Sequence, residues 1–130
     1  MKRNILLFFV LVVLSPLLAI PFGYLLNSYI FIISGGFATF SLPTDLSAII
    51  NGLPVSYLFL TPLLFIILGK SKKLLVAIIL SLPMLIFSYI VSPEYLFWSL
   101  IFFISGIILA KLINIIISKF KRPNPPMVIK

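Results

Sequence analysis

The sequence contains no cysteine and no histidine, and only two of its 130 residues are acidic. Without cysteine there is no disulfide and no thiolate chemistry, and without both residue types the usual zinc and haem ligands are missing. Two carboxylates also fall short of the roughly six to eight oxygens that a calcium ion takes. We therefore expect no metal and no cofactor.

Ionisable groups are equally scarce in the middle of the apolar stretches. None contains Asp, Glu or Arg at its centre, and Lys111 lies near the end of its stretch. Ion-coupled transporters and voltage sensors keep such groups at the membrane midplane. Hydrolytic enzymes within membranes need a base with a nucleophile, or a metal motif, and neither is present. We therefore expect a protein that is not an enzyme.

Hydrophobic residues dominate what is present. They make up 62% of the chain, whereas charged residues make up 9%. A soluble domain is about 45–50% apolar and about 25% charged. A chain this short has too much surface to hide so much apolar sequence from water, so a lipid bilayer must be its main solvent.

Four apolar runs are near the roughly 20 residues that a membrane-spanning helix needs. They cover residues 5–26, 53–69, 74–91 and 95–118. The first run is too long for the hydrophobic core of a signal peptide, and no A-x-A-like site follows it, so we interpret it as an uncleaved span. The prediction is an all-α integral membrane protein with a four-helix membrane domain over residues 1–122. The proline-rich residues 123–130 form a tail beyond it.

Basic residues predict the orientation of this four-span arrangement. All ten fall on one side of it: Lys2, Arg3, Lys70, Lys72, Lys73, Lys111, Lys119, Lys121, Arg122 and Lys130. An excess of Lys and Arg marks the cytoplasmic side, so both termini are expected there, in a cell inner or plasma membrane or an organelle inner membrane. Every Tyr and the single Trp fall near the outer ends of the spans, where amphipathic rings prefer the headgroup level.

The stretch "SLPTDLSAIINGLP", residues 41–54, lies in the long outer connection. Thr44 is a suitable helix cap, Gly52 a suitable helix end, and Pro54 suits the first turn of a following helix. The pattern predicts a short amphipathic surface helix over about residues 45–51. A segment that re-enters the membrane within residues 29–53 is the alternative, because apolar sequence and a glycine pair precede the stretch.

Hydroxyl and proline residues stand together near the middle of three spans. The residues are Ser15, Pro16, Thr61, Pro62, Ser81 and Pro83. Proline frees a backbone carbonyl, so three kinks that face one another would line a polar pathway. The simpler interpretation is that the prolines only bend their helices and that the hydroxyls bond to nearby backbone.

Small residues on the last span indicate close helix packing. Gly106 and Ala110 form a small-xxx-small pair, with Ser105 beside it, and such pairs let two helices approach closely. The partner helix is either another span of this chain or another subunit.

Two further groups of residues are candidates for contacts at the membrane surfaces. Asp45, Asn51 and Glu94 are candidates for an outer partner contact, although a carboxylate there also simply suits a helix N-terminus. The basic rim would attract anionic lipids, although the positive-inside rule alone accounts for it. Its residues are Lys70, Lys72, Lys73, Lys119, Lys121 and Arg122.

The function expected from these features is non-catalytic. The favoured hypothesis is a structural or accessory subunit of a larger membrane complex, with membrane lipids and other membrane subunits as partners. A small oligomeric channel or transporter built from proline-kinked helices is the alternative, and a homo-oligomer is compatible with both. Nucleic acid is not an expected partner, because the basic residues lie in short turns and ends rather than on a folded basic face.

Overall fold

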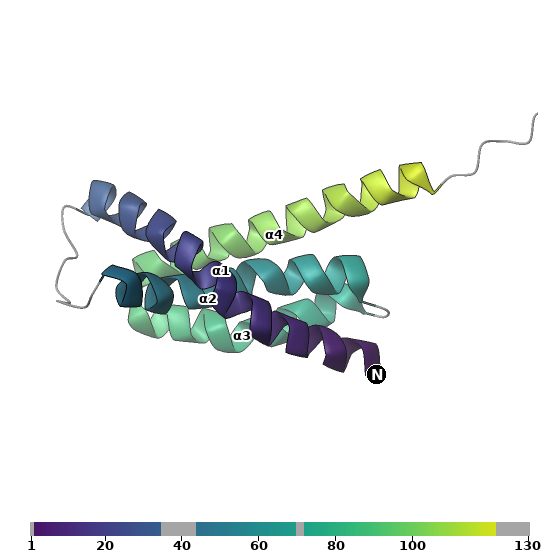
Figure 1. The fold of residues 1–130 in the computed structure, drawn as a ribbon, viewed down its shortest axis with the longest axis horizontal. Helices are drawn as coiled ribbons and strands as arrows, with labels where there is room; N and C mark the ends of the chain where they lie inside the picture. The colour runs from purple at the N-terminus through teal and green to yellow at the C-terminus, as the bar shows by residue number, and fades with distance from the viewer. Residues whose placement is uncertain (1, 35–43, 70–71, 122–130) are drawn as a thin grey trace, which may run out of the picture.

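The computed structural model describes residues 2–34, 44–69 and 72–121, and these form four α-helices. The helices are α1 (Lys2–Ser34), α2 (Thr44–Leu68), α3 (Lys73–Val91) and α4 (Pro93–Phe120) (Figure 1). All four are long and apolar enough to cross a membrane. The prediction of an all-helical protein with four such helices is confirmed, whereas the tail at residues 123–130 lies outside the described residues.

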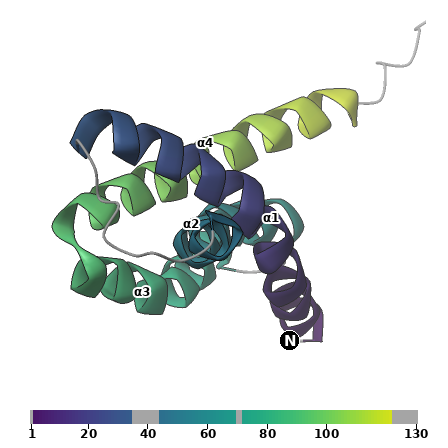
Figure 2. The same ribbon diagram turned by 60° about the vertical axis from the view of Figure 1, so that its left-hand side comes forward.

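Helix α2 is the central element of the bundle. It packs against each of the other three helices, and Figure 2 shows it nearly end-on between them. Within its membrane-spanning window 56% of the residues are buried inside the protein, against 11% for α4. The outer surfaces of α1, α3 and α4 are covered by large aliphatic and aromatic side chains, as a bilayer environment requires.

The predicted surface helix at residues 45–51 is wrong as a separate element. The structure contains one continuous helix from Thr44 to Leu68, which includes both that stretch and the span expected at residues 53–69. Gly52 and Pro54 therefore lie inside a helix. The physical reason is that Gly52 serves a close contact with α1 instead of a helix end, as described below. Of the re-entrant alternative at residues 29–53, residues 29–34 belong to α1 and residues 44–53 to α2, and only residues 35–43 lie outside the described residues.

The junction between α3 and α4 follows from the local sequence Ser92-Pro93-Glu94. The Ser92 hydroxyl accepts a hydrogen bond of 3.0 Å from the backbone N–H of Tyr95 and so caps α4. Pro93 occupies the first turn, where its missing N–H leaves no bond unmade, and Glu94 places a negative charge near the positive end of the helix dipole. A tight reversal is therefore possible with a single residue between the two helices.

The helices are arranged so that one end of the bundle is basic. The start of α1, the end of α2, the start of α3 and the end of α4 all lie toward the same end in Figure 1.

Two apolar clusters fill the interior of the described part of the bundle. One is built on Leu7, Leu11, Leu60, Phe65 and Ala77, and the other on Leu26, Val55 and Tyr95.

Candidate functional site

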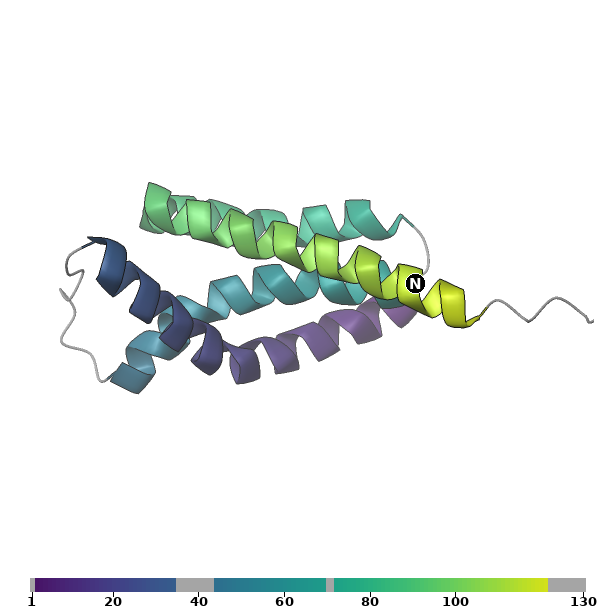
Figure 3. The ribbon, with the colours of Figure 1, turned by 90° about the horizontal axis from the view of Figure 1, so that it is seen from above.

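Helices α1 and α2 cross through small residues that recur every four positions. On α1 the sequence provides Ser15, Ala19 and Gly23, and on α2 it provides Ala48, Gly52 and Ser56; all six are buried. Figure 3 shows the two helices crossing. A Cβ atom added to Gly23 would lie 1.8 Å from the carbonyl oxygen of Ala48.

The contact is reciprocal. A Cβ atom added to Gly52 would lie 1.8 Å from the carbonyl oxygen of Ala19 and 2.6 Å from the backbone nitrogen of Gly23. Only glycine fits at either position, because the obstacle is backbone rather than the end of a flexible side chain. In lipid, where no hydrophobic effect drives two apolar helices together, such backbone proximity maximises van der Waals contact. The two helices are therefore held together by van der Waals contact between closely fitting backbone surfaces.

A hydrogen bond continues the same crossing toward the basic end. The buried Ser56 hydroxyl is 2.8 Å from the carbonyl oxygen of Ser15 on α1 and 2.9 Å from that of Leu53 on its own helix. The hydroxyl carries one proton, so it donates to the two oxygens in a shared bond. This places a polar link two residues after Pro54, which lacks a backbone N–H.

The small pair predicted on α4 lies against α2. A Cβ atom on Gly106 would lie 2.5 Å from the carbonyl oxygen of Phe59 and 2.9 Å from the Cγ of Pro62, so α4 approaches α2 closely at this point. Ala110 is also fully buried. Ser105 is only partly buried, and its hydroxyl donates to the carbonyl of Phe102 one turn back on α4. The structure thus places the close approach at Gly106 rather than Ser105.

Two side chains of α4 bond to the backbone of α2 at either end of this contact. The Tyr95 hydroxyl donates to the carbonyl of Asn51, and the Asn114 side-chain amide donates over 3.2 Å to the carbonyl of Ile66. Ile66 lies in the last turn of α2, where carbonyl groups have no partner within the helix. Asn114 on α4 therefore caps the C-terminal end of α2.

Side-chain hydrogen bonds join α3 to α2 and to α4. The Tyr57 hydroxyl on α2 donates over 3.2 Å to the carbonyl of Leu80. At the other end of α3 the Ser99 hydroxyl of α4 donates to the Ser88 hydroxyl at 3.0 Å, and Ser88 in turn donates to the carbonyl of Met84. The resulting chain of hydroxyls is fully buried at both serines. Each of the two hydroxyls therefore has a hydrogen-bond partner within the protein.

An aromatic cluster joins α1, α2 and α4. The ring of Phe22 on α1 lies 5.3 Å from the ring of Phe59 on α2 and 5.3 Å from that of Phe102 on α4. The second of these pairs is edge-to-face, which is a favoured arrangement for aromatic rings. Phe22 thus extends the α1–α2 contact to the fourth helix.

The hydroxyl and proline pairs do not converge on one internal surface. Pro16 and Pro83 are exposed on the outer sides of α1 and α3, whereas Pro62 is fully buried beside Gly106. The hydroxyls point inward, and two of them bond to their own helices. Thr61 donates to the carbonyl of Tyr57 at 2.6 Å, and Ser81 donates to that of Ala77 at 2.7 Å.

The predicted outer contact residues have different surroundings. Glu94 is exposed in the first turn of α4. Asn51 is partly buried and its backbone carbonyl is engaged by Tyr95, so it belongs to the α2–α4 contact. Asp45 lies in the first turn of α2, but its side chain is outside the described residues.

The predicted basic rim is divided between two helix ends. Lys72 and Lys73 lie at the start of α3, and Lys119 and Lys121 lie exposed at the end of α4. Lys72 adopts a left-handed backbone conformation, with φ of 45°, as the chain enters α3. Lys70 and Arg122 lie outside the described residues.

Sequence reasoning missed the α1–α2 crossing, Tyr57, Asn114 and the Ser88–Ser99 pair. The spacing of small residues every four positions was a usable signal for the crossing, although it does not say which helix faces which. Within the described part of the chain, every buried side-chain nitrogen and oxygen has a hydrogen-bond partner. The described helices therefore contact one another without leaving a buried polar side-chain atom unpaired.

Comparison with protein-family models found no match for this chain. Searches of curated proteins and of solved structures found no match either.

Proposed function

We propose that this protein is a multi-pass integral membrane protein that acts as a non-catalytic structural or accessory subunit of a larger membrane complex. In this proposal both termini are cytoplasmic, and other membrane subunits bind to the outer faces of the bundle. The observation that supports it best is the complete pairing of buried polar atoms among the described residues. A solute pathway needs polar groups that face an opening, whereas here hydroxyls bond to backbone or to each other.

The close contacts of α2 add a second line of support. Backbone atoms of α1 and α4 approach α2 so closely at Gly23, Gly52 and Gly106 that a methyl group would clash. A pathway between these helices would require them to separate. A rigid bundle with an apolar exterior suits a protein whose role is to be bound by others.

The exterior offers several faces to a partner helix. On α1 the side chains of Leu6, Phe9, Val13 and Leu17 recur at helical spacing and are each about two-thirds exposed. Ile86 on α3 and Ile108 on α4 are exposed on other faces of the bundle. The proposal requires that at least one of these faces touches another protein rather than lipid.

Gentle solubilisation of the tagged protein from its native membrane, followed by native mass spectrometry, tests the proposal. We expect other chains to accompany it in fixed stoichiometry. A photo-crosslinking residue placed in turn at Leu17, Ile86 and Ile108 should then capture the same partner from one helix face only. If the protein instead purifies as a lone homo-oligomer that passes ions or solutes in liposomes, the channel hypothesis replaces this one.

The proposed orientation has a separate test, because the chain has no cysteine of its own. Cysteine introduced at Glu94 should react with a membrane-impermeant thiol reagent added outside cells, and cysteine at Lys119 should react only after the membrane is opened. Both side chains are exposed, so neither variant disturbs packing. The reverse labelling pattern would overturn the orientation and leave the proposed role untouched.

A further inference from the structure

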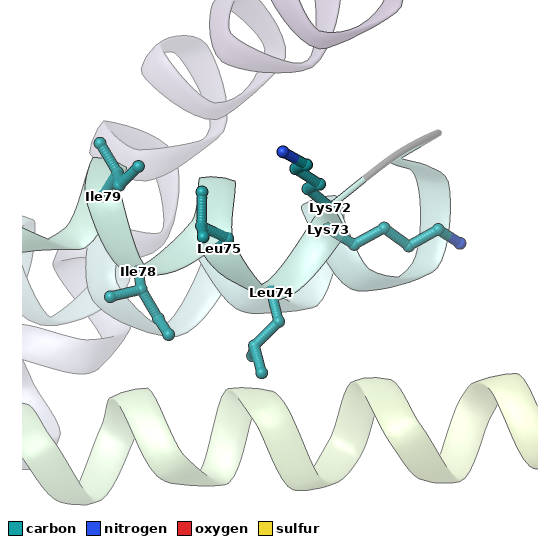
Figure 4. A pocket seen from close by; sticks show the side chains of 6 residues that line it. All are labelled: Lys72, Lys73, Leu74, Leu75, Ile78 and Ile79. Carbon is teal, nitrogen blue, oxygen red and sulfur yellow. The ribbon is translucent and has the colours of Figure 1, made fainter.

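A hollow open to the outside lies along the first turns of α3. Its lining is Lys72, Lys73, Leu74, Leu75, Ile78 and Ile79. Figure 4 shows Leu74 and Ile78 on one side of the helix and Leu75 and Ile79 on the other, with Lys72 and Lys73 at its start and their ammonium groups pointing apart. The four aliphatic side chains are each about half exposed, so this surface is apolar and is not covered by the protein itself.

The length of α3 sets the depth of this hollow in a bilayer. Its 19 residues extend over roughly 28 Å, close to the roughly 30 Å of the hydrocarbon core. Lys72 and Lys73 then lie at the headgroup level of one membrane face. The aliphatic residues follow directly below them and reach roughly 9 Å into the acyl layer at Ile79, at 1.5 Å per residue.

The end of the bundle at which the hollow lies carries charge of one sign. The start of α1 and the end of α4, which lie toward the same end of the bundle, carry Lys2, Arg3 and Lys119. The only acidic residues of the chain, Asp45 and Glu94, stand in the first turns of α2 and α4, at the opposite end. An occupant with a negative group at phosphate depth would therefore meet Lys72 and Lys73 at the hollow itself and no carboxylate.

We propose that this hollow is a binding site for an anionic phospholipid. Its phosphate is held by Lys72 and Lys73, and its acyl chain lies along Leu74, Ile78 and their neighbours. A free inorganic anion would use only the lysines, and a zwitterionic lipid would gain less from them, because its headgroup carries no net charge. The site is independent of the proposed role as a subunit, because purified protein in lipid is sufficient to test it.

The test compares retention of phosphatidylglycerol and phosphatidylcholine by the purified protein, measured by native mass spectrometry from mixed-lipid detergent micelles. We expect selective retention of phosphatidylglycerol. The double variant K72Q/K73Q should weaken it by about tenfold or more, because each lysine near a membrane surface contributes about fivefold. The matched control K119Q/K121Q removes the same charge at the exposed end of α4, and it should weaken retention by much less.

The apolar part of the site has its own pair of variants. Ile78→Trp fills the hollow and should reduce phosphatidylglycerol retention, whereas Ile86→Trp, at an exposed position farther along α3, should not. Equal loss in both lysine variants would show general attraction to the basic end and overturn the site. Equal retention of the two lipids, displacement by inorganic phosphate, or no effect of Ile78→Trp would overturn it as well.

Discussion

The α1–α2 crossing and the α3–α4 pair show two different ways to hold helices together in lipid. The first uses backbone contact, with glycine on each helix facing a carbonyl of the other. The second pairs the side chains of Ser88 and Ser99 near the junction of the two helices, and Figure 1 shows α4 leaving the bundle toward its other end. Close shape complementarity needs a long matched surface, whereas a hydroxyl pair fixes one point.

The comparison implies different sensitivities to substitution. A crossing defined by backbone proximity tolerates no added atom, whereas a hydroxyl pair can be lost at the cost of one interaction. Measured interhelical hydrogen bonds in membranes average about 0.6 kcal/mol. Steric overpacking costs about 1–3 kcal/mol and occasionally more. The largest effects should therefore come from the smallest residues.

Gly52→Ala should have the largest effect, because its new methyl carbon would lie 1.8 Å from the Ala19 carbonyl oxygen, far inside van der Waals contact. We expect a loss of about 3 kcal/mol or more in the free energy of unfolding, measured by SDS titration in mixed micelles. Leu17→Phe, which adds volume on the exposed side of α1, is the matched control and should change little. Equal stability of Gly52→Ala and the parent protein would mean that α1 and α2 do not approach this closely.

Gly106→Ala extends the comparison to the α2–α4 contact. The added methyl group would lie 2.5 Å from the Phe59 carbonyl and 2.9 Å from Pro62, a less severe overlap than at Gly52. The expected loss is about 1–3 kcal/mol in the same titration. Ser105→Ala removes a hydroxyl that bonds only within α4, so its effect should be smaller. The reverse order would indicate that α4 meets α2 through a different face.

Ser99→Ala tests the polar contact between α3 and α4. Ser88 keeps its own bond to the Met84 carbonyl, so the expected loss is about 0.6 kcal/mol. A double-mutant cycle of Ser88→Ala with Ser99→Ala measures the pair directly. A coupling energy indistinguishable from zero would show that the serines do not link the helices.

Pro83→Ala should have the smallest effect of the four. Pro83 is exposed on α3, and alanine would restore a backbone N–H that can bond to the Ile79 carbonyl. We expect no loss of stability or assembly in the same SDS titration and in gel filtration. A selective loss of solute transport in liposomes, with assembly intact, would instead support the channel hypothesis.

The presence of four membrane helices could be predicted because hydrophobic runs of membrane length leave few alternatives. The start of α2 could not be predicted, because Gly52 and Pro54 are compatible both with a break between two helices and with the interior of one membrane helix. In water a glycine commonly ends a helix, whereas in lipid it commonly allows a neighbouring backbone to approach. Which meaning applies depends on Ala19 and Gly23 on another helix, and the local pattern does not contain that information.

The candidate site was predictable to a similar extent. Gly106 could be recognised as a packing residue from its spacing to Ala110, but the helix that it faces could not. Asn114 gave no local signal, because its partner is the end of α2, 48 residues earlier in the chain. Pairing of distant helices depends on the shapes of two surfaces together, so a single sequence determines the elements more readily than their contacts.

The central claim is that α1 and α2 form a closed antiparallel crossing, and one cross-linking measurement tests it most directly. The chain lacks cysteine, so a Ser15→Cys, Ser56→Cys double variant can be oxidised in native membranes without background. Because the Ser56 hydroxyl lies 2.8 Å from the Ser15 carbonyl, the two positions are adjacent, and we predict an intramolecular disulfide, with no cross-link when Leu17→Cys replaces Ser15→Cys. Cross-links only between separate chains, or equal cross-linking from the exposed Leu17 position, would contradict the closed crossing.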